Sequence, residues 1–421
     1  MDITKTPIGT SQPADKSALL GSLMTDFNSR LLTGLAGKNL LYFDTGKLLN
    51  TVIANPSAYG FTNTTDAAVQ LSLGKVPSPS TDGYLFADIR HPSARFHRIM
   101  SDWIYSSLQA GNRAALFPIL PIRRSGTQWL TIDNRLQAFK NFGYRGQGFF
   151  VSGDYANSSV NASADLPKGN SNGGGFVLGY EKAFTEQLFS GVTLGYGHNP
   201  FDLGNNQGSL DYDEWALSVF ASHKLGAFNT SVSARYSWLD FESDRTVVLG
   251  PFKSNERGKT DGDQFGVKGQ IGYNFVVGSI LHGPIAGLTW ERVTVNGFDE
   301  TSGSVTAMNF GDQARESLRS RFGWQAASEI DWSGAKVRPF VQMSYDFEHL
   351  KDERSYRVGF VGGTSGLDMY TANQTGGYGT LLAGINTELS KTIRFGINGT
   401  TTISQPGADN AAVNAMLGVS F

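Results

Sequence analysis

From about residue 142 to the C-terminus the sequence alternates with a period of two, and this pattern restricts the fold more than any other feature. Apolar and aromatic side chains occupy every second position, and glycine, polar or charged residues stand between them. Clear examples are 188–196, 232–238, 265–273 and 337–347. Alternate side chains of a β-strand point to opposite faces. This part of the chain is therefore predicted to be mainly β, with one apolar face.

Two features favour a transmembrane barrel over a soluble sheet. The predicted strands are long, and their apolar faces tend to end in Tyr, Trp or Phe, as an interfacial girdle would. No apolar run approaches the roughly 18 residues of a membrane helix. The longest candidate, 114–122, contains Pro118 and Pro121. Only helices and closed barrels satisfy every backbone polar group in lipid, so a membrane form of this chain must be a closed barrel.

Twelve segments carry the alternation, an even number as expected of bacterial barrels. They centre near 150, 179, 193, 217, 234, 269, 287, 322, 342, 382, 396 and 416. Short links join some segments, and longer polar loops are expected at 156–172, 241–260, 296–314 and 350–373. We predict a twelve-stranded antiparallel transmembrane β-barrel over 143–421. Residues 354–360 are an alternative additional strand.

The phase of the strands predicts which side chains face lipid. Trp238, Tyr196, Trp290, Trp324 and Tyr345 are expected on the lipid face or at its interface. An arginine on that face near the midplane costs roughly 2–4 kcal/mol, so charged positions should face the lumen. The inward charges expected are Arg145, Glu181, Glu214, Arg235, Lys268, Glu291, Arg319, Arg321, Arg338 and Arg394. They either line a pore or, as we favour, pair with each other and with a helix in the lumen.

That helix is predicted over 125–140, where Ser125 can cap it and Asp133, Arg135 and Lys140 supply charges. Its length is roughly 24 Å at about 1.5 Å per residue, which matches an apolar band of about 25 Å. The segment 111–124 contains two prolines and is expected to be a linker.

Residues 1–110 have α/β periodicity. Helical spacing predicts helices over about 15–36, from about 46 to 55, and from Pro92 to about 109. Short apolar runs predict strands at 40–43 and 84–87. This region has the pattern of the last third of a layered α/β domain.

The pair Asp88 and His91 follows the second of these strands. An Asp three residues before a His can accept a hydrogen bond from one ring nitrogen and leave the other facing a serine hydroxyl. The alternative is an ordinary loop aspartate beside a surface histidine. Sequence spacing alone does not separate the two.

An ordered series of motifs carries a family resemblance. Asp2-Ile-Thr-Lys-Thr-Pro7, Phe27-Asn28, Tyr42-Phe-Asp44, Asn55-Pro-Ser-Ala-Tyr-Gly-Phe-Thr-Asn63 and Asp88-Ile-Arg-His-Pro92 together resemble the C-terminal third of GDSL (SGNH) esterases and lipases. Residues 125–421 resemble an autotransporter translocator with its lumenal helix. The final strand, ending on Phe421, resembles the signature that the barrel-assembly machinery of outer membranes reads.

This resemblance implies an outer-membrane protein whose N-terminal passenger faces the cell exterior. It also implies that Asp88 and His91 are the Asp and His of a Ser-Asp-His triad that acts on an ester or lipid. The expected surroundings are outer-membrane lipid and lipopolysaccharide, and the expected state is a monomer.

The departures from the family pattern concern the rest of the catalytic machinery. The Gly-Asp-Ser nucleophile block and the Gly-x-Asn-Asp oxyanion block are absent from the sequence. We therefore expect these blocks and a secretory signal upstream of Met1, and no esterase activity from this chain alone. Two alternatives remain open: an active hydrolase with an unrecognised serine, and a pore or adhesin barrel with a plug segment.

Composition excludes several other classes. The absence of cysteine rules out disulfides, thiolate metal sites and a catalytic Cys. The net charge of -2 gives no basis for nucleic-acid binding. The six histidines show no metal-ligand spacing, so neither a metal nor a cofactor is expected.

Overall fold

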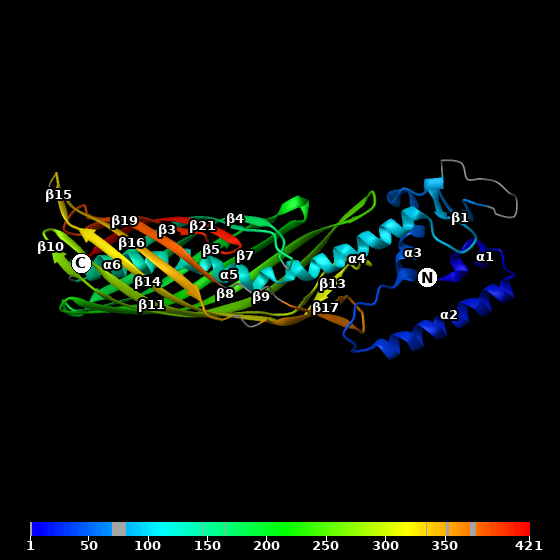
Figure 1. Ribbon diagram of the computed structural model, residues 1–421, viewed down its shortest axis with the longest axis horizontal. Helices are drawn as coiled ribbons and strands as arrows, with labels where there is room; N and C mark the ends of the chain where they lie inside the picture. Colours follow the sequence, from blue (N-terminus) through cyan, green and yellow to red (C-terminus); the bar gives the residue numbers. More distant parts are fainter. Residues whose placement is uncertain are drawn as a thin grey trace.

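The computed structural model describes residues 2–69, 81–144, 146–164, 166–333, 335–350, 353–370 and 376–421. The molecule is elongated, with a β-barrel at one end and a small α/β region at the other (Figure 1). A long helical stretch runs from the α/β region into the barrel. We call residues 2–109 the N-terminal region.

The barrel is closed and antiparallel, and its twelve strands confirm the predicted number. The strands are β3 (Gln147–Val160), β4 (Gly169–Ala183), β5 (Leu188–Asn199), β7 (Gly208–Leu225), β8 (Phe228–Leu249), β9 (Phe252–Tyr273), β11 (Ile280–Val295), β14 (Gln313–Ser328), β16 (Ala335–Glu348), β19 (Gly376–Glu388), β20 (Ile393–Ile403) and β21 (Ala408–Ser420). The first and last strands, β3 and β21, pair from Val160↔Ala408 to Gly148↔Ser420. Each strand therefore has two hydrogen-bonded neighbours, and no barrel edge is left open.

The two ends of the barrel differ in their connections. One end has short turns, extended only by β10 (Phe275–Val277) and β15 (Ile330–Trp332). The other end carries β6 (Phe201–Leu203) and a separate four-stranded sheet of β12 (Phe298–Asp299), β13 (Met308–Phe310), β17 (Ser355–Phe360) and β18 (Gly366–Tyr370). The alternative strand at 354–360 is thus β17, outside the barrel. Short turns are typical of the periplasmic side, and longer connections of the extracellular side.

The predicted phase of the strands is confirmed. Trp238, Trp324 and Tyr345 are 50%, 49% and 55% exposed on the outer face. Tyr196 and Trp290 are partly exposed on the same face. The inward arginines have carboxylate partners: Arg235 with Glu214, Arg319 with Glu291, Arg321 with Asp346, and Arg338 with Glu329 and Glu388. Arg145 lies outside the described residues.

The polarity of β8 inverts along its length. The outward side chains from Val232 to Trp238 are apolar or aromatic, and those between them face inward and are polar. Directly beyond Trp238 the outward residues are Asp240, Glu242 and Asp244, followed by Thr246 and Val248, whereas Leu239, Phe241, Val247 and Leu249 are buried inside. An outer surface that leaves lipid and enters water requires this exchange of faces.

This inversion explains a wrong prediction. The segment 241–260, expected to be a polar loop, is the continuous upper part of β8 and β9, joined only by Gly250 and Pro251. Its outward charges give the sequence a loop-like composition, although the backbone ladder continues unbroken from Phe228↔Tyr273 to Leu249↔Phe252. We call residues 239–262 the outer ribbon.

The predicted linker at 111–124 is also wrong, because this segment is helical. Helices α4 (Ala94–Ala114), α5 (Leu116–Gln128) and α6 (Leu130–Phe142) follow one another, and the residues between them, Ala115 and Trp129, keep right-handed helical backbone angles. Pro118 lies in the first turn of α5, where its missing N–H costs little. Burial of Leu116, Ile119 and their neighbours against apolar strand residues offsets the bond lost at Pro121. Among the described residues, no helix is long and apolar enough to span a membrane.

Helices α5 and α6 fill the lumen, as predicted for 125–140. Arg135 donates to both carboxylate oxygens of the fully buried Glu181 at 2.8 and 2.6 Å, and Arg394 donates to the same carboxylate at 2.7 Å. Lys268 donates to Asp133 at 2.7 Å. Further hydrogen bonds join the helices to β3, β7, β11, β16, β20 and β21. Lys140 is buried without an ion pair to any described residue.

The N-terminal region follows the predicted order with one exception. Helices α2 (Ala14–Leu35) and α3 (Thr45–Ala54) and strand β2 (Tyr84–Phe86) match it, and β2 pairs in parallel with β1 (Asn63–Ala67). A short helix, α1 (Pro7–Thr10), precedes them. The predicted strand at 40–43 is not a strand: it is an extended loop whose backbone contacts Gly366 through a single bridge at Asn39. A strand needs a continuous ladder with a neighbour, and none forms there.

The lipid-facing phase gives a testable consequence. Val219 lies on the outer face of β7, opposite Ala234 and between the Trp215–Trp238 pair and the turn after Leu225. Val219→Arg should lower the free energy of unfolding by about 2–4 kcal/mol in phospholipid vesicles, because it places a charge near the midplane. Leu225→Arg, at the rim of the same strand, should cost about 0–1 kcal/mol. Equal costs in denaturant titrations would contradict the assigned membrane position.

Candidate functional site

The Asp88–His91 pair lies in a loop whose two ends are tied together. Strand β2 ends at Phe86, and α4 begins at Ala94. The N–H of Ala87 donates to the carbonyl of His91 at 2.8 Å, and the N–H of Ser93 donates to the carbonyl of Leu85 at 2.8 Å. Phe86 and Pro92 form an antiparallel bridge. These bonds close a tight turn that joins a buried strand to a helix and projects residues 88–91 outward.

Within this turn the carboxylate of Asp88 orients the imidazole of His91. Its Oδ1 accepts from the N–H groups of Arg90 and His91, both at 2.8 Å. Nδ1 of His91 lies 2.8 Å from Oδ2 of Asp88. Since an ionised carboxylate only accepts, Nδ1 carries a proton, and in the neutral ring Nε2 then has the lone pair. The structure thus brings together the two residues that the sequence predicted.

The free nitrogen of His91 faces the solvent. The side chain is 73% exposed, whereas that of Asp88 is 30% exposed. Nε2 has no hydrogen bond within the described part of the chain, and no described serine donates to it. A neutral imidazole held in this way can take a proton from a hydroxyl placed at Nε2.

Electrostatics keep Asp88 ionised. Partial desolvation raises the pKa of its carboxyl, but the N–H of Arg90 and the ring and N–H of His91 outweigh this effect and lower the pKa to about 2. A carboxylate that accepts several hydrogen bonds is stabilised in its charged form. Asp88 therefore stays negative over the range in which His91 would act as a base.

Sequence reasoning missed the contacts that hold α4 behind this loop. Asp102 accepts from the N–H of Gly250 at 2.8 Å, at the turn of the outer ribbon. Arg95 donates to the carbonyl of Asp82 at 2.7 Å. No sequence signal identifies Asp102, because its partner is a backbone group 148 residues away. Among the described residues there is no group of three or more His, Asp or Glu that could hold a metal ion.

The pKa of Asp88 predicts a pH dependence. An unfolded Asp has a pKa near 3.9, so the ionised carboxyl stabilises the loop above about pH 4. That contribution is lost as the pH falls from about 4 to about 2. Carbon-13 NMR of the Asp88 carboxyl should give a midpoint near pH 2.

His91→Ala supplies the control for this titration. It should raise the pKa of Asp88, yet leave it below the unfolded value, because both N–H donors remain. A wild-type midpoint at the unfolded value would contradict the described hydrogen bonds.

Comparisons with known proteins agree with this architecture. The chain is 26% identical over 337 residues to Lipase 1 of Photorhabdus luminescens. This aligned stretch covers 76% of this chain and 48% of that protein. It is 24% identical over 380 residues to Esterase EstA of Pseudomonas aeruginosa, covering 83% of this chain and 56% of that protein. The chain thus spans about half the length of these curated relatives.

The barrel also resembles a solved structure. The translocator domain of the autotransporter NalP from Neisseria meningitidis matches with a TM-score of 0.57 and 14% identity, over 73% of this chain and all of that one. The family model "Autotransporter beta-domain" matches residues 149–400, more than half of the chain. This chain therefore belongs to the autotransporter β-domain family and lies in the bacterial outer membrane.

Proposed function

We propose that this protein translocates and anchors a GDSL-type esterase passenger, to which the N-terminal region contributes the orienting acid and the base. The observation that carries the proposal is the Asp88–His91 pair, with Nε2 of His91 directed to solvent beside a strand-to-helix turn. The names of the relatives, a lipase and an esterase, support the same activity. The proposed substrate is an ester or lipid met at the cell surface.

In the proposed reaction His91 acts first as base and then as acid. Nε2 removes the proton of a serine hydroxyl as the oxygen attacks the ester carbonyl, and then returns that proton to the leaving alcohol oxygen. The acyl group is then on the serine, and a water that gives its proton to Nε2 attacks it and releases the carboxylic acid as the proton returns to the serine oxygen. Asp88 does not exchange the proton; it fixes the ring and stabilises the imidazolium. In the family, the serine and the oxyanion donors belong to the Gly-Asp-Ser and Gly-x-Asn-Asp blocks, and neither block is present in this sequence.

The filled lumen favours an anchor over a diffusion pore. Helices α5 and α6 occupy the barrel interior and are held by buried ion pairs, so no open channel is needed to explain the inward charges. The continuous helical stretch from α4 to α6 connects the candidate site to this plug. A passenger held in this way stays attached at the cell surface.

The esterase proposal predicts how activity depends on a nucleophile. The purified, refolded 421-residue chain should show no His91-dependent turnover of p-nitrophenyl esters. Fusion of the Gly-Asp-Ser and Gly-x-Asn-Asp segment of an esterase relative in frame should restore turnover. In that fusion, His91→Ala should remove activity, and His97→Ala, six residues along on α4, should not.

Two outcomes would contradict this prediction. Turnover by the unfused chain that disappears in His91→Ala would reveal a serine that the sequence motifs do not identify. A well-folded, active fusion that tolerates His91→Ala would show that this histidine is not the base.

The same proposal includes the surroundings and assembly of the barrel. We propose that lipopolysaccharide surrounds the barrel, that the protein is a monomer, and that the barrel-assembly machinery recognises Phe421.

Phe421 is 64% exposed, and its ring lies 5.8 Å from that of Phe149 on the neighbouring strand. Phe421→Ala should lower the fraction of heat-modifiable, folded barrel in cells. Phe184→Ala, at an exposed periplasmic turn, is the matched control. Equal assembly of both variants would argue against recognition of the C-terminal residue.

A further inference from the structure

A cavity of about 310 Å³ lies between three elements at the extracellular end of the molecule: α4, the upper part of β8 and the loop at 204–207. Its volume falls in the range of small-molecule sites. The residues of α4 that line it recur at helical spacing, from Asp102 through Ser106 and Gln109 to Arg113, so one face of the helix is turned towards it. The cavity shares no described residue with the turn at 87–92 and is therefore a separate candidate site.

Another face of α4 is buried against the outer ribbon. Ile99 and Trp103 belong to a hydrophobic core that also contains Val247 and Leu249 of β8, which are 0% and 1% exposed. The helix and the strand that form two walls of the cavity are thus held together by packed side chains.

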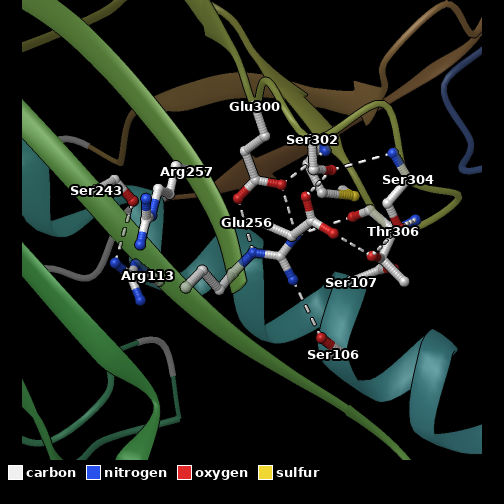
Figure 2. A network of polar contacts seen from close by, with 12 residues as sticks. Ser106, Ser107, Arg113, Ser243, Glu256, Arg257, Glu300, Ser302, Ser304 and Thr306 are labelled. Carbon is white, nitrogen blue, oxygen red and sulfur yellow. Dashed lines mark hydrogen bonds and ion pairs between the residues drawn. The ribbon is translucent and has the colours of Figure 1, made fainter. Parts of the chain in front are cut away.

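A buried polar network supports these two walls (Figure 2). Arg245 donates to both carboxylate oxygens of Glu300 at 2.8 and 2.6 Å and to the carbonyl of Thr306 at 2.9 Å. Its other terminal nitrogen donates to the hydroxyl of Ser106 on α4 at 3.1 Å. Arg245 and Glu300 are 4% and 2% exposed, so the charge of this arginine is neutralised inside the protein.

Arg113 ties the third wall, the loop at 204–207, to α4. Its Nη1 donates to the carbonyl of Gln207 at 2.9 Å. Its Nη2 donates to the carbonyl of Asp244 at 2.8 Å and to the hydroxyl of Ser243 at 3.1 Å, and Figure 2 shows the serine contact. All three walls are therefore fixed by bonds within the protein, and the cavity is pre-formed.

The cavity is surrounded by polar side chains that the protein leaves unused. Asn205 and Asn206 have φ angles of 59° and 55°, in the left-handed region that few residues other than glycine adopt. Four of the unused side chains are primary amides, each with a carbonyl acceptor and an NH₂ donor. The lining side chains without a hydrogen bond to any described residue are Tyr105, Gln109, Asn205, Asn206, Gln207 and Thr246.

The lining argues against an anion and against an acyl chain. The charge of Arg245 is neutralised by Glu300, and both terminal nitrogens of Arg113 already bind protein oxygens. Neither guanidinium therefore presents a free fork to a phosphate or carboxylate. Among the described lining residues, only Ala110 and Val248 have side chains without a polar atom, which is too little apolar wall for an acyl chain.

We propose that this cavity binds a sugar residue of a cell-surface glycan. Sugar hydroxyl groups donate and accept hydrogen bonds, and the amide side chains match both roles. The ring of Tyr105, which is 61% exposed, and the side chain of Val248 offer an apolar surface to the C–H face of the sugar. A site built to hydrogen-bond hydroxyl groups rejects ligands that lack them.

Two sources supply this chemistry: the lipopolysaccharide around the barrel and a soluble saccharide outside the cell. The inference rests on the outer-membrane orientation and not on ester hydrolysis.

Binding is measured on the full chain refolded in phospholipid vesicles. The probes are an array of neutral oligosaccharides and the core oligosaccharide released from lipopolysaccharide, followed by saturation-transfer NMR. At least one probe should bind, and dodecanoate, the probe for an acyl-chain site, should not displace it. Absence of saccharide binding at millimolar concentrations, or displacement by dodecanoate, would overturn the proposal.

Two variants locate the bound sugar. Asn206→Gly removes one amide and keeps the positive φ, and Tyr105→Ala removes the ring; each should raise the Kd by about tenfold or more. Ser404→Gly, at another extracellular turn with a φ of 57°, and Ile104→Ala, 40% exposed on α4, are the matched controls. Both should stay within about twofold of the wild type. Heat-modifiable mobility should be the same in all four. Binding that is unchanged in Asn206→Gly and Tyr105→Ala would overturn the proposal.

A second reconstitution separates the two sources. Amide hydrogen exchange at 205–207 is compared in phospholipid vesicles, in vesicles that also contain lipopolysaccharide, and in phospholipid vesicles with the bound oligosaccharide added. Slower exchange in the lipopolysaccharide vesicles, lost in Asn206→Gly, would identify the glycan of the surrounding membrane. Slower exchange with the added oligosaccharide alone would identify a soluble saccharide. Unchanged exchange in both would contradict binding at this cavity.

Discussion

Arg135 and Arg394 share the fully buried carboxylate of Glu181, and these ion pairs join helix α6 in the lumen to strands β4 and β20 of the barrel. In lipid the barrel must close and face its apolar side outward, so its charges and polar groups point into the lumen. Buried charges are costly unless they are paired and hydrogen-bonded. Filling the lumen with α5 and α6 provides partners for many of these groups at once. The helical stretch continues from this packing through α4 into the N-terminal region.

The same constraint explains the change in the outer part of the molecule. Where β8 leaves the membrane after Trp238, the apolar residues move to the inner face and charged residues to the outer face. The helix inside changes in step: apolar residues of α5 pack against Leu239, Phe241 and their neighbours. The barrel therefore has an apolar outer face where it crosses the membrane. Beyond the membrane it has a polar outer face and an apolar interior, as a soluble β-protein does. This second organisation is what allows it to share a core with the N-terminal region.

The Asp88–His91 pair and the Arg245 network differ in the range over which they act. The pair is formed within four consecutive residues, and backbone N–H groups of the same turn hold the carboxylate. The network joins Arg245 to Glu300 and to Ser106, which lie 55 and 139 positions away from it along the chain. The turn alone can preserve the geometry of the pair. The orientation of α4, which follows this turn, depends on its contacts with the outer ribbon. The candidate chemistry and its support are thus encoded in different halves of the chain.

The sequence alone determined the class and the strand number, because lipid enforces alternation along every strand that crosses it, and one misplaced arginine is costly. It also predicted that Asp88 and His91 lie side by side, since the spacing and the turn are local. Only the tertiary structure decided that 111–124 is helical and that 241–260 is a ribbon. Prolines and surface charges predict loops, and their effect was outweighed by burial in the barrel mouth and by a continuous β-ladder. The shared core was likewise invisible in the sequence, because Val247 and Leu249 contact residues that lie far away along the chain.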